Sequence, residues 1–257
     1  MTKTFMLVSR SMDSPLLVVS ERANTTFIAV QDIITVHTEE KTWRIIMKIG
    51  IIGAGFVGRT IATLAVRSGH QVMVSNSRGP QTLFSLRALT GSEIGTVDEA
   101  VHFGEVTVVA VPLAAYRSVP VAPLAGKIVI DTDNYYPERD GHIAELDQHE
   151  TTTSELLSAH LPDSRVVKAF NAVRMTDLER DGRYAGSPDR LALPLCGDDV
   201  QAKAIAAQLY EEFGFDTVDA GPLSEGWRFE NGTPAYCARL DKADLEKALA
   251  AASRKGP

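Results

Sequence analysis

The fold is decided by residues 47–58, which read Met-Lys-Ile-Gly-Ile-Ile-Gly-Ala-Gly-Phe-Val-Gly. Three isoleucines predict a buried strand that ends in a Gly53-x-Gly55-x-x-Gly58 turn, and helical spacing of apolar residues follows until Gly69. A strand, a glycine turn and a helix are the context in which this pattern binds a dinucleotide. There Gly53 permits the tight turn, Gly55 lets the backbone approach a pyrophosphate, and Gly58 allows close packing of helix on strand. The helix N-terminus offers N–H groups to the phosphates, so the stretch predicts a dinucleotide site rather than an ordinary turn.

The residues at the end of the next predicted strand, 71–75, select the cofactor. An NAD site usually carries an acidic side chain there, which binds the ribose 2′-hydroxyl. This chain has Asn76 instead, flanked by Ser75, Ser77 and Arg78. A guanidinium can form charge-assisted hydrogen bonds with a 2′-phosphate, and hydroxyl groups can donate further ones. A polar turn with a solvated arginine is the alternative, but given the glycine motif we favour NADP(H) over NAD.

Downstream, apolar runs alternate with amphipathic stretches, which predicts an α/β fold. We expect a Rossmann-type dinucleotide-binding fold, with a mostly parallel sheet and a small C-terminal α/β extension. Further strands are predicted at 94–97, 105–111, 127–130, 165–171, 191–196 and 215–219. Helices are predicted at 80–90, at 97–103 and at 151–158, the last with a capping box from Thr152 to Glu155. Two more are predicted between a cap at Asp198 or Asp199 and Gly214, and from the cap Thr233-Pro234 to about Ala252. We divide the chain into residues 1–46, an NADP-binding domain at 47–164, and a part at 165–257 that completes the substrate site.

Residues 1–46 do not fit this pattern. Two strands, Leu16–Val19 and Thr26–Val36, could form a hairpin through Arg22-Ala23-Asn24. The first strand of a dinucleotide domain normally lies close to the chain start, and Met47 stands there. Our hypothesis is that Met47 is the biological start, or that 1–46 is a loosely attached extension without chemistry of its own.

The composition sets limits on the partners. The net charge of −7 over 257 residues argues against a nucleic acid or an anionic membrane surface as the main partner. No apolar run approaches the roughly 20 residues that span a bilayer. Cys196 and Cys237 make neither a disulfide framework nor a metal motif, and the histidines have no ligand spacing. We therefore expect a cytoplasmic protein without a metal site, whose partner is a small-molecule redox co-substrate.

The crevice of an open α/β sheet lies outside the carboxyl ends of its strands. Val111, Pro112 and Leu113 follow one predicted strand and should wall the adenosine and nicotinamide. Asn134 and Tyr135 follow the next strand, in a loop that suits a substrate wall as well as a simple turn.

Three stretches together resemble the short NADP oxidoreductases typified by the coenzyme F-420 (deazaflavin)-dependent NADP reductase. They are Gly53–Gly58, Ser75–Pro80 and Val167–Asn171, and the resemblance covers about residues 47–223. It implies roles for Gly53, Ala54, Gly55, Phe56 and Val57 at the pyrophosphate, Ser77 and Arg78 at the 2′-phosphate, and Val111, Pro112 and Leu113 beside the nicotinamide. It also implies that a deazaflavin ring stacks on the nicotinamide near the loop 168–173. The loop 226–229 departs from the family, which leaves the second substrate open.

Hydride transfer to a flavin-type ring requires two stacked rings rather than a protein acid or base in the hydride step. Asn171 and Trp227 are the expected substrate-side residues, an amide for a ring carbonyl and an aromatic lid. Trp227 equally suits a core or a dimer interface. Lys168 is a weak candidate acid, and we favour a structural lysine bonded to a carbonyl or to an anionic ligand.

Two other functions stay open. The chain could reduce a small carbonyl or imine with Lys168 or Tyr135 as proton donor, or it could be a non-catalytic NADP(H)-binding sensor. A more distant resemblance to 6-phosphogluconate dehydrogenase, hydroxyacid dehydrogenase and pyrroline-carboxylate reductase bears on the first. Those enzymes append a long helical domain, whereas the residues after Ser164 alternate strand with helix. A homodimer through the closing helix is also open, because one apolar stripe serves a core as well as a dimer.

Overall fold

The computed structural model describes residues 25–30, 33–38 and 46–254, and the chain divides into two compact units at residue 45. In the first unit β1 (Thr25–Val30) pairs antiparallel with β2 (Ile33–Thr38). The prediction of one strand over Thr26–Val36 is therefore wrong, because that range spans parts of two antiparallel strands, with Val30 of β1 paired to Ile33 of β2. The other predicted strand, Leu16–Val19, and the turn at residues 22–24 lie outside the described residues.

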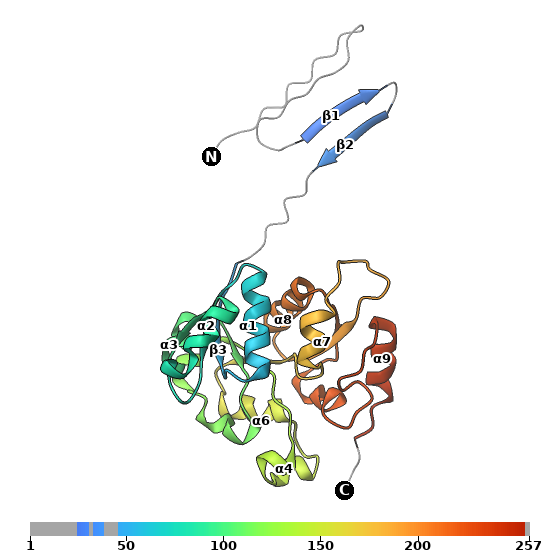
Figure 1. Ribbon diagram of the computed structural model, residues 1–257. Coiled ribbons are helices and arrows are strands. Elements are labelled where there is room, and N and C mark those ends of the chain that lie inside the picture. The colour runs from blue at the N-terminus through green and yellow to red at the C-terminus, as the bar shows by residue number, and fades with distance from the viewer. Residues whose placement is uncertain (1–24, 31–32, 39–45, 255–257) are drawn as a thin grey trace. The chain divides into compact units, whose positions relative to one another are not determined.

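The second unit is built on an eight-stranded sheet (Figure 1). Its six parallel strands are β3 (Lys48–Ile52), β4 (Gln71–Ser75), β5 (Glu93–Gly95), β6 (Val106–Val109), β7 (Ile128–Asp131) and β8 (Arg165–Lys168). They lie in the order β5-β4-β3-β6-β7-β8, so the strand order reverses between β3 and β6. This is the order of a dinucleotide-binding sheet, whose crevice lies at that reversal.

Two further strands extend the sheet beyond β8. β9 (Ala192–Gly197) runs antiparallel to β8, and β10 (Asp216–Asp219) runs parallel to β9. The Rossmann-type, mostly parallel sheet with a small C-terminal α/β extension is thus confirmed. The division at residue 164 stays a prediction, and β8, which follows it, pairs directly with β7.

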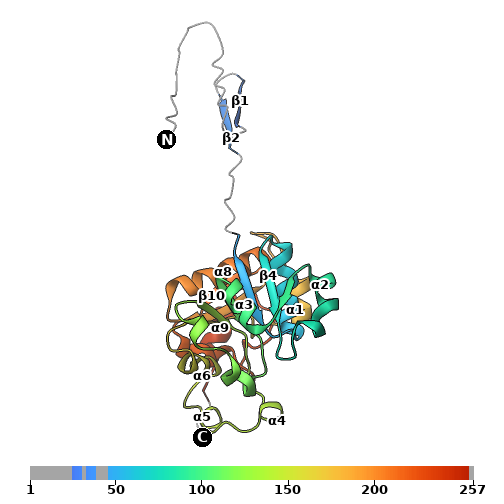
Figure 2. The same cartoon turned by 90° about the vertical axis from the view of Figure 1, so that its left-hand side faces the viewer.

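Helices cover both faces of the sheet (Figures 1 and 2). One hydrophobic core holds α1 (Phe56–Arg67), α2 (Phe84–Thr90), α7 (Met175–Arg180) and α8 (Val200–Phe213). The other holds α3 (Val97–Phe103), α6 (Thr153–His160) and α9 (Lys242–Ala251). The strands supply side chains to both layers, as Ile51 does to the first and Ile52 to the second. They therefore read as continuous apolar runs in the sequence.

Short helices fill the connections. α4 (Pro137–Asp140) and α5 (Ala144–Asp147) lie in the long loop after β7. The 3₁₀ turns of the described part of the chain are η1 (Pro80–Leu83), η2 (Leu113–Ser118), η3 (Ala122–Leu124) and η4 (Leu223–Phe229). No helix among the described residues is long and apolar enough to cross a membrane.

The helix caps agree with the sequence except at the C-terminal end. Thr152 begins α6 with a capping box, and Asp199 caps α8. The predicted start of the last helix at Thr233 is wrong, because α9 begins after Asp241, whose side chain accepts a hydrogen bond from the Asp244 amide. The Thr233 hydroxyl instead donates to the carbonyl of Glu230 and closes a turn.

Candidate functional site

The glycine turn lies where β3, β4 and β6 meet. Gly53 has a φ of +116°, and a Cβ on it would lie 2.1 Å from the carbonyl oxygen of Ala110. A Cβ on Gly58 would lie 1.9 Å from the carbonyl oxygen of Gly53, so both positions require glycine for packing. A Cβ on Gly55 would meet no atom within 4 Å. The backbone at Gly55 therefore faces open space at the N-terminus of α1, where a phosphate would bind.

A cavity of about 530 Å³ extends from this turn toward β4, and we call it the Arg78 cavity. Its lining includes the predicted cofactor residues Gly53, Ala54, Gly55, Asn76, Ser77, Arg78, Val111 and Pro112. The turn that carries Arg78 is fixed by its own hydrogen bonds, since the Arg78 amide donates to Asn76 Oδ1 at 3.0 Å and Gln81 donates to the Arg78 carbonyl at 2.8 Å. The Arg78 guanidinium has no protein partner among the described residues. An anion entering the cavity would meet an unpaired positive charge, as a 2′-phosphate requires.

Three predicted cofactor residues lie beneath the cavities instead of lining them. The buried hydroxyl of Ser75 donates to the Ile51 carbonyl at 2.9 Å. Ser75 therefore cannot donate to a 2′-phosphate, and that interpretation is corrected. Leu113 is buried in the second core, and Gly58 supports the turn from within α1.

A second cavity, of about 300 Å³, lies on the other side of the glycine turn, and we call it the Asn171 cavity. Both cavities share Gly55, Val111 and Pro112, so they form one crevice along the carboxyl ends of the strands. The predicted residues Phe56, Val57, Asn134 and Asn171 line it. So does Phe170, from the loop 168–173 that the resemblance placed near the deazaflavin ring. Asp133, Tyr136, Arg139, Met175 and Tyr236 also line it, and the sequence analysis gave none of these five a role of its own.

The amide of Asn171 is oriented by its neighbours. Asn171 Nδ2 donates to the Phe229 carbonyl at 3.0 Å and to Asn134 Oδ1 at 3.2 Å, while Asn134 Nδ2 donates to the Asn171 carbonyl at 3.0 Å. Both N–H groups of Asn171 are thus used within the protein, and the predicted donation to a ring carbonyl is corrected. Asn171 Oδ1 is buried and has no partner among the described residues.

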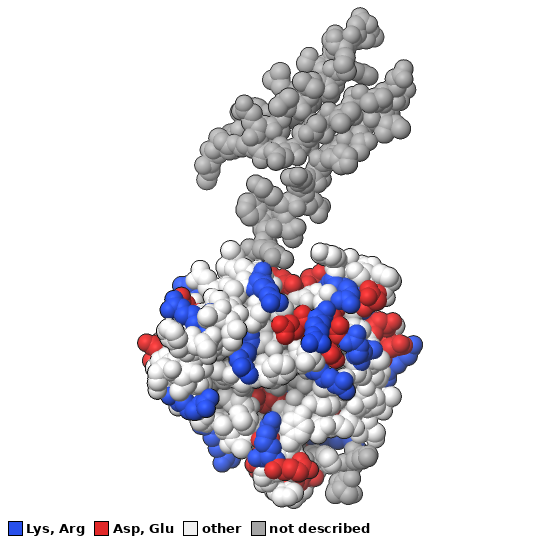
Figure 3. Space-filling model, viewed as in Figure 1, with Lys and Arg blue, Asp and Glu red and all other residues white. Residues whose placement is uncertain are grey.

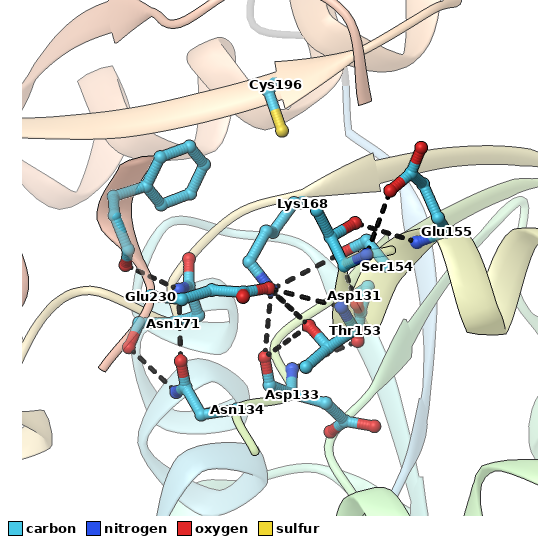
Figure 4. Close-up of polar contacts among 12 residues, drawn as sticks. Asp131, Asp133, Asn134, Thr153, Ser154, Glu155, Lys168, Asn171, Cys196 and Glu230 are labelled. Carbon is cyan, nitrogen blue, oxygen red and sulfur yellow. Dashed lines mark hydrogen bonds and ion pairs between the residues drawn. The ribbon is translucent and has the colours of Figure 1, made fainter. Parts of the chain in front are cut away.

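Lys168 lies behind this cavity in a closed polar cluster (Figure 4). Its ammonium donates to Thr153 Oγ1 at 2.6 Å and to the Asp133 carbonyl at 3.0 Å, and it pairs with Glu230 at 3.1 Å. Burial disfavours the charge, but the carboxylates of Glu230 and Asp131 outweigh burial and raise the pKa of Lys168. The side chain is fully buried and does not line the Asn171 cavity. This geometry agrees with a structural lysine and not with a proton donor to substrate.

Asp133 lies in the loop after β7, next to Asn134. Its backbone carbonyl contacts Lys168, but its carboxylate points away from Lys168 (Figure 4). Burial, and next the neighbouring Asp131 carboxyl, raise the pKa of Asp133 well above its usual value. Lys168, Arg139 and a hydrogen bond from the Val111 backbone oppose this rise. Asp133 Oδ2 is buried and has no partner among the described residues.

Trp227 and Tyr135 line a different cavity, of about 270 Å³, which also includes His149 and Arg254. The guanidinium groups of Arg228 and Arg254 lie over the Trp227 ring, 4.6 and 5.9 Å from its centroid. The Tyr135 hydroxyl donates to Asp147 at 2.7 Å. The structure thus separates both residues from Asn134 and Asn171, so neither a Trp227 lid nor a Tyr135 proton donor fits the Asn171 cavity.

Basic and acidic side chains are interspersed over the face shown in Figure 3. Within the part of the chain that the structure describes, no group of three or more His, Cys, Asp or Glu is placed to hold a metal ion. The expectations about metals, nucleic acids, membranes and dimers stay predictions.

A family model described as NADP oxidoreductase, coenzyme F420-dependent, matches residues 48–135. That stretch contains the glycine turn, the Arg78 turn and the loop with Asp133 and Asn134. The chain is related to the NADP-dependent oxidoreductases. The resemblance that the motifs indicated is thereby confirmed.

Metalloreductase STEAP3 of Rattus norvegicus is 32% identical over 188 residues, which are 71% of this chain and 36% of that protein. The chain therefore spans about a third of the length of the metalloreductases it matches. Among solved structures, a hypothetical protein of Sinorhizobium meliloti is 27% identical with a TM-score of 0.68, over 77% of this chain and 96% of that one. A protein of Arthrobacter sp. FB24 named as an F420-dependent NADP reductase is 26% identical with a TM-score of 0.59, over 68% and 85%.

Proposed function

We propose that this chain transfers hydride between NADP(H), bound along the Arg78 cavity, and a flavin or deazaflavin ring in the Asn171 cavity. The observation that carries the proposal is the junction of the two cavities at Gly55, Val111 and Pro112. A dinucleotide whose 2′-phosphate meets Arg78 and whose pyrophosphate meets Gly55 would place its nicotinamide at this junction. The acceptor would then lie beside it, in the Asn171 cavity.

The side chains of the Asn171 cavity suit a planar acceptor. Val57, Val111, Met175 and the rings of Tyr136 and Tyr236 provide apolar and aromatic surface. When bound, NADPH supplies a hydride from nicotinamide C4, and the acceptor takes up that hydride together with one proton from solvent. The residues of the cavity hold the two rings in contact and exclude water, which removes orientational entropy from the barrier. No protein acid is needed in the hydride step, so the enclosure of Lys168 does not impede it.

The names of the relatives support an acceptor of this class. One is named as an F420-dependent NADP reductase, and others are named as metalloreductases. A nicotinamide gives up two electrons as a hydride, whereas a metal ion commonly takes up one electron at a time. A flavin can accept a hydride and then release its two electrons one at a time, so a flavin is an acceptor compatible with both names.

Reduction of a small carbonyl or imine is the second candidate, because a pair of tyrosine hydroxyls lies on the Asn171 cavity. The hydroxyls of Tyr136 and Tyr236 are hydrogen-bonded to each other. Burial, followed by the hydrogen bond to Tyr136, raises the pKa of Tyr236, which makes it a poorer acid. The position of the two hydroxyls therefore favours a proton donor to a carbonyl or imine, but the raised pKa of Tyr236 does not. A non-catalytic NADP(H) sensor would bind NADPH without oxidising it.

The test is oxidation of NADPH and NADH by the purified chain, followed at 340 nm. The acceptors are riboflavin, FMN, FAD, deazaflavin, a cyclic imine, and ferric citrate with and without added flavin. The proposal predicts turnover with at least one ring acceptor and reduction of ferric citrate only when flavin is present. Turnover with the imine alone would establish the second candidate, and NADPH binding without turnover on any acceptor would overturn both.

A further inference from the structure

Two residues that line the Asn171 cavity each carry a buried polar atom without a partner, and the two atoms have complementary chemistry. Asp133 and Asn171 are each only 4% exposed, and both line the cavity. Asp133 Oδ2 and Asn171 Oδ1 have no hydrogen-bond partner among the described residues. A buried polar atom without a partner costs free energy, so a ligand that pairs with it binds more tightly.

Asn171 can only accept a hydrogen bond from such a ligand. Its Nδ2 already donates to the Phe229 carbonyl, which is an acceptor and cannot donate. That contact determines which end of the amide is oxygen, and Oδ1 is the atom left free. The matching ligand group is therefore an N–H.

Asp133 is suited to donate. Its carboxyl is buried beside the carboxyl of Asp131, and the raised pKa that results favours the protonated form. A protonated carboxyl has an O–H, which needs an acceptor. The other charged groups around it, Lys168 and Arg139, are each held elsewhere, by Glu230 and by Asp140. The matching ligand group is therefore a carbonyl or a ring nitrogen.

We propose that Asp133 and Asn171 together recognise an amide group of the bound ligand, Asp133 donating to its C=O and Asn171 accepting from its N–H. This inference rests on the proposed function and specifies the chemistry of its second cavity. Two ligands of the proposed reaction carry such a group: NADP(H), in the carboxamide of its nicotinamide, and a flavin or deazaflavin, in its pyrimidinedione edge. Each would place the amide in the Asn171 cavity, next to the hydride-transfer junction.

The protein side of the test compares Asp133→Asn with Asp133→Leu. Asparagine keeps a neutral donor and the shape of the side chain, whereas leucine removes the hydrogen bond. Thr107→Val is the matched control, because Thr107 Oγ1 is also buried and unpartnered but lies in β6 and does not line the cavity. The ligand measured is NADP⁺ or riboflavin, whichever carries the recognised amide. We expect Asp133→Leu to weaken its binding about 10-fold, Asp133→Asn to weaken it less than about 3-fold, and Thr107→Val to have no effect.

The ligand side separates the two sources of the amide. NADP⁺ and its 3-acetylpyridine analogue, which lacks the carboxamide N–H, are titrated by calorimetry without turnover. Riboflavin and 3-methylriboflavin, which lacks the imide N–H, are compared through the KM of the reductase reaction. For the recognised molecule, the wild type should bind the altered analogue about 10-fold more weakly than the parent molecule. The Asn171→Ala variant should bind that analogue and its parent equally well.

Circular dichroism and thermal unfolding establish that each variant is folded. Should Asp133→Leu fail to fold, the analogue comparison on the wild type decides by itself. Equal affinity for both members of each pair, with no effect of either Asp133 variant, would overturn the inference. Binding of NADP⁺ with carboxamide discrimination, but no reduction of any ring, would support the inference while overturning the proposed function.

Discussion

The hydroxyl of Tyr210 accepts a hydrogen bond from the backbone N–H of Phe170 at 2.7 Å and donates to the Pro194 carbonyl at 2.9 Å. Phe170 has a φ of +63°, which is unusual for a bulky side chain. The two rings also pack edge to face, with centroids 4.6 Å apart. Tyr210 of α8 therefore holds the turn that brings Asn171 to the cavity after β8.

Replacing Tyr210 with phenylalanine should destabilise the fold and loosen this turn. The Phe170 N–H would lose its buried acceptor, which costs about 1–3 kcal/mol. Urea unfolding measures the loss, and the control is Tyr184→Phe, whose side chain is 92% exposed and should change stability by less than about 0.5 kcal/mol. Equal stability of the two variants would show that the Tyr210 hydroxyl does not hold the turn.

The glycines of the turn should separate binding from folding. Gly55→Ala adds a Cβ in open space at a φ of −72°, so the fold should keep its melting temperature while NADPH binding falls at least about 10-fold. Gly58→Ala drives a Cβ against the Gly53 carbonyl and should destabilise the fold itself. Calorimetric titration and thermal unfolding of both variants check this, and unchanged NADPH affinity in Gly55→Ala would contradict the phosphate site.

Arg78→Ala should reduce the preference for NADPH over NADH. A hydrogen bond to a charged group contributes about 1.5–3 kcal/mol, so affinity for NADPH should fall roughly 10- to 150-fold while that for NADH stays constant. Arg87→Ala is the control, because Arg87 is an exposed arginine of α2 whose partner is Glu93. Equal losses for both cofactors would indicate that Arg78 does not contact a 2′-phosphate.

The single variant Lys168→Met should be less stable than the double variant in which Glu230 is also neutralised. Lys168→Met leaves Glu230 and Asp131 without their counter-charge, a loss of about 3–5 kcal/mol for a buried pair. Glu230→Gln in the same chain should restore part of it, and chemical denaturation of the single and double variants measures the coupling.

Because of the same lysine, we expect the stability of the fold to fall at alkaline pH. Its folded-state pKa is raised above the unfolded value of about 10.4. Its contribution to stability is therefore fully present below that value and is lost as pH rises through the folded-state pKa. Unfolding free energy followed from pH 8 upward should fall more steeply in the wild type than in Lys168→Met.

Ligand affinity should also depend on pH through Asp133. Because burial, and next the neighbouring Asp131 carboxyl, raise the pKa of Asp133 well above its usual value, the protonated donor persists to higher pH than in a free aspartate, and affinity should fall as pH rises through the raised pKa. The charged groups around Asp133 are Lys168 and Arg139, whose raised pKa values keep them charged while carboxyls titrate, and Asp131, whose own pKa is raised by burial. Asp133→Asn should bind with a flat pH profile, and a profile identical to that of the wild type would contradict the assignment.

Local signals were sufficient for most of the fold. The glycine turn, the β-branched runs and the caps at Thr152 and Asp199 act over a few residues, so the sequence predicts them well. The start of α9 was misplaced because Thr233-Pro234 has the form of a helix cap, whereas the Thr233 hydroxyl is used to close a turn. Tyr236 was missed for the same reason, since it was placed inside the predicted closing helix, of which only the part from Lys242 onward is helical.

The sequence by itself determined the α/β class, the dinucleotide turn and the basic residue that points to NADP(H), because glycine conformation, period and charge are properties of short stretches. Only the tertiary structure decided which polar side chains are free to meet a ligand. Ser75, Lys168 and the amide N–H groups of Asn171 all look available in the sequence, but each is engaged by residues from distant strands and loops. Hydrogen bonds are satisfied across the fold, so a free partner such as Asp133 Oδ2 is identified only when every neighbour is in place.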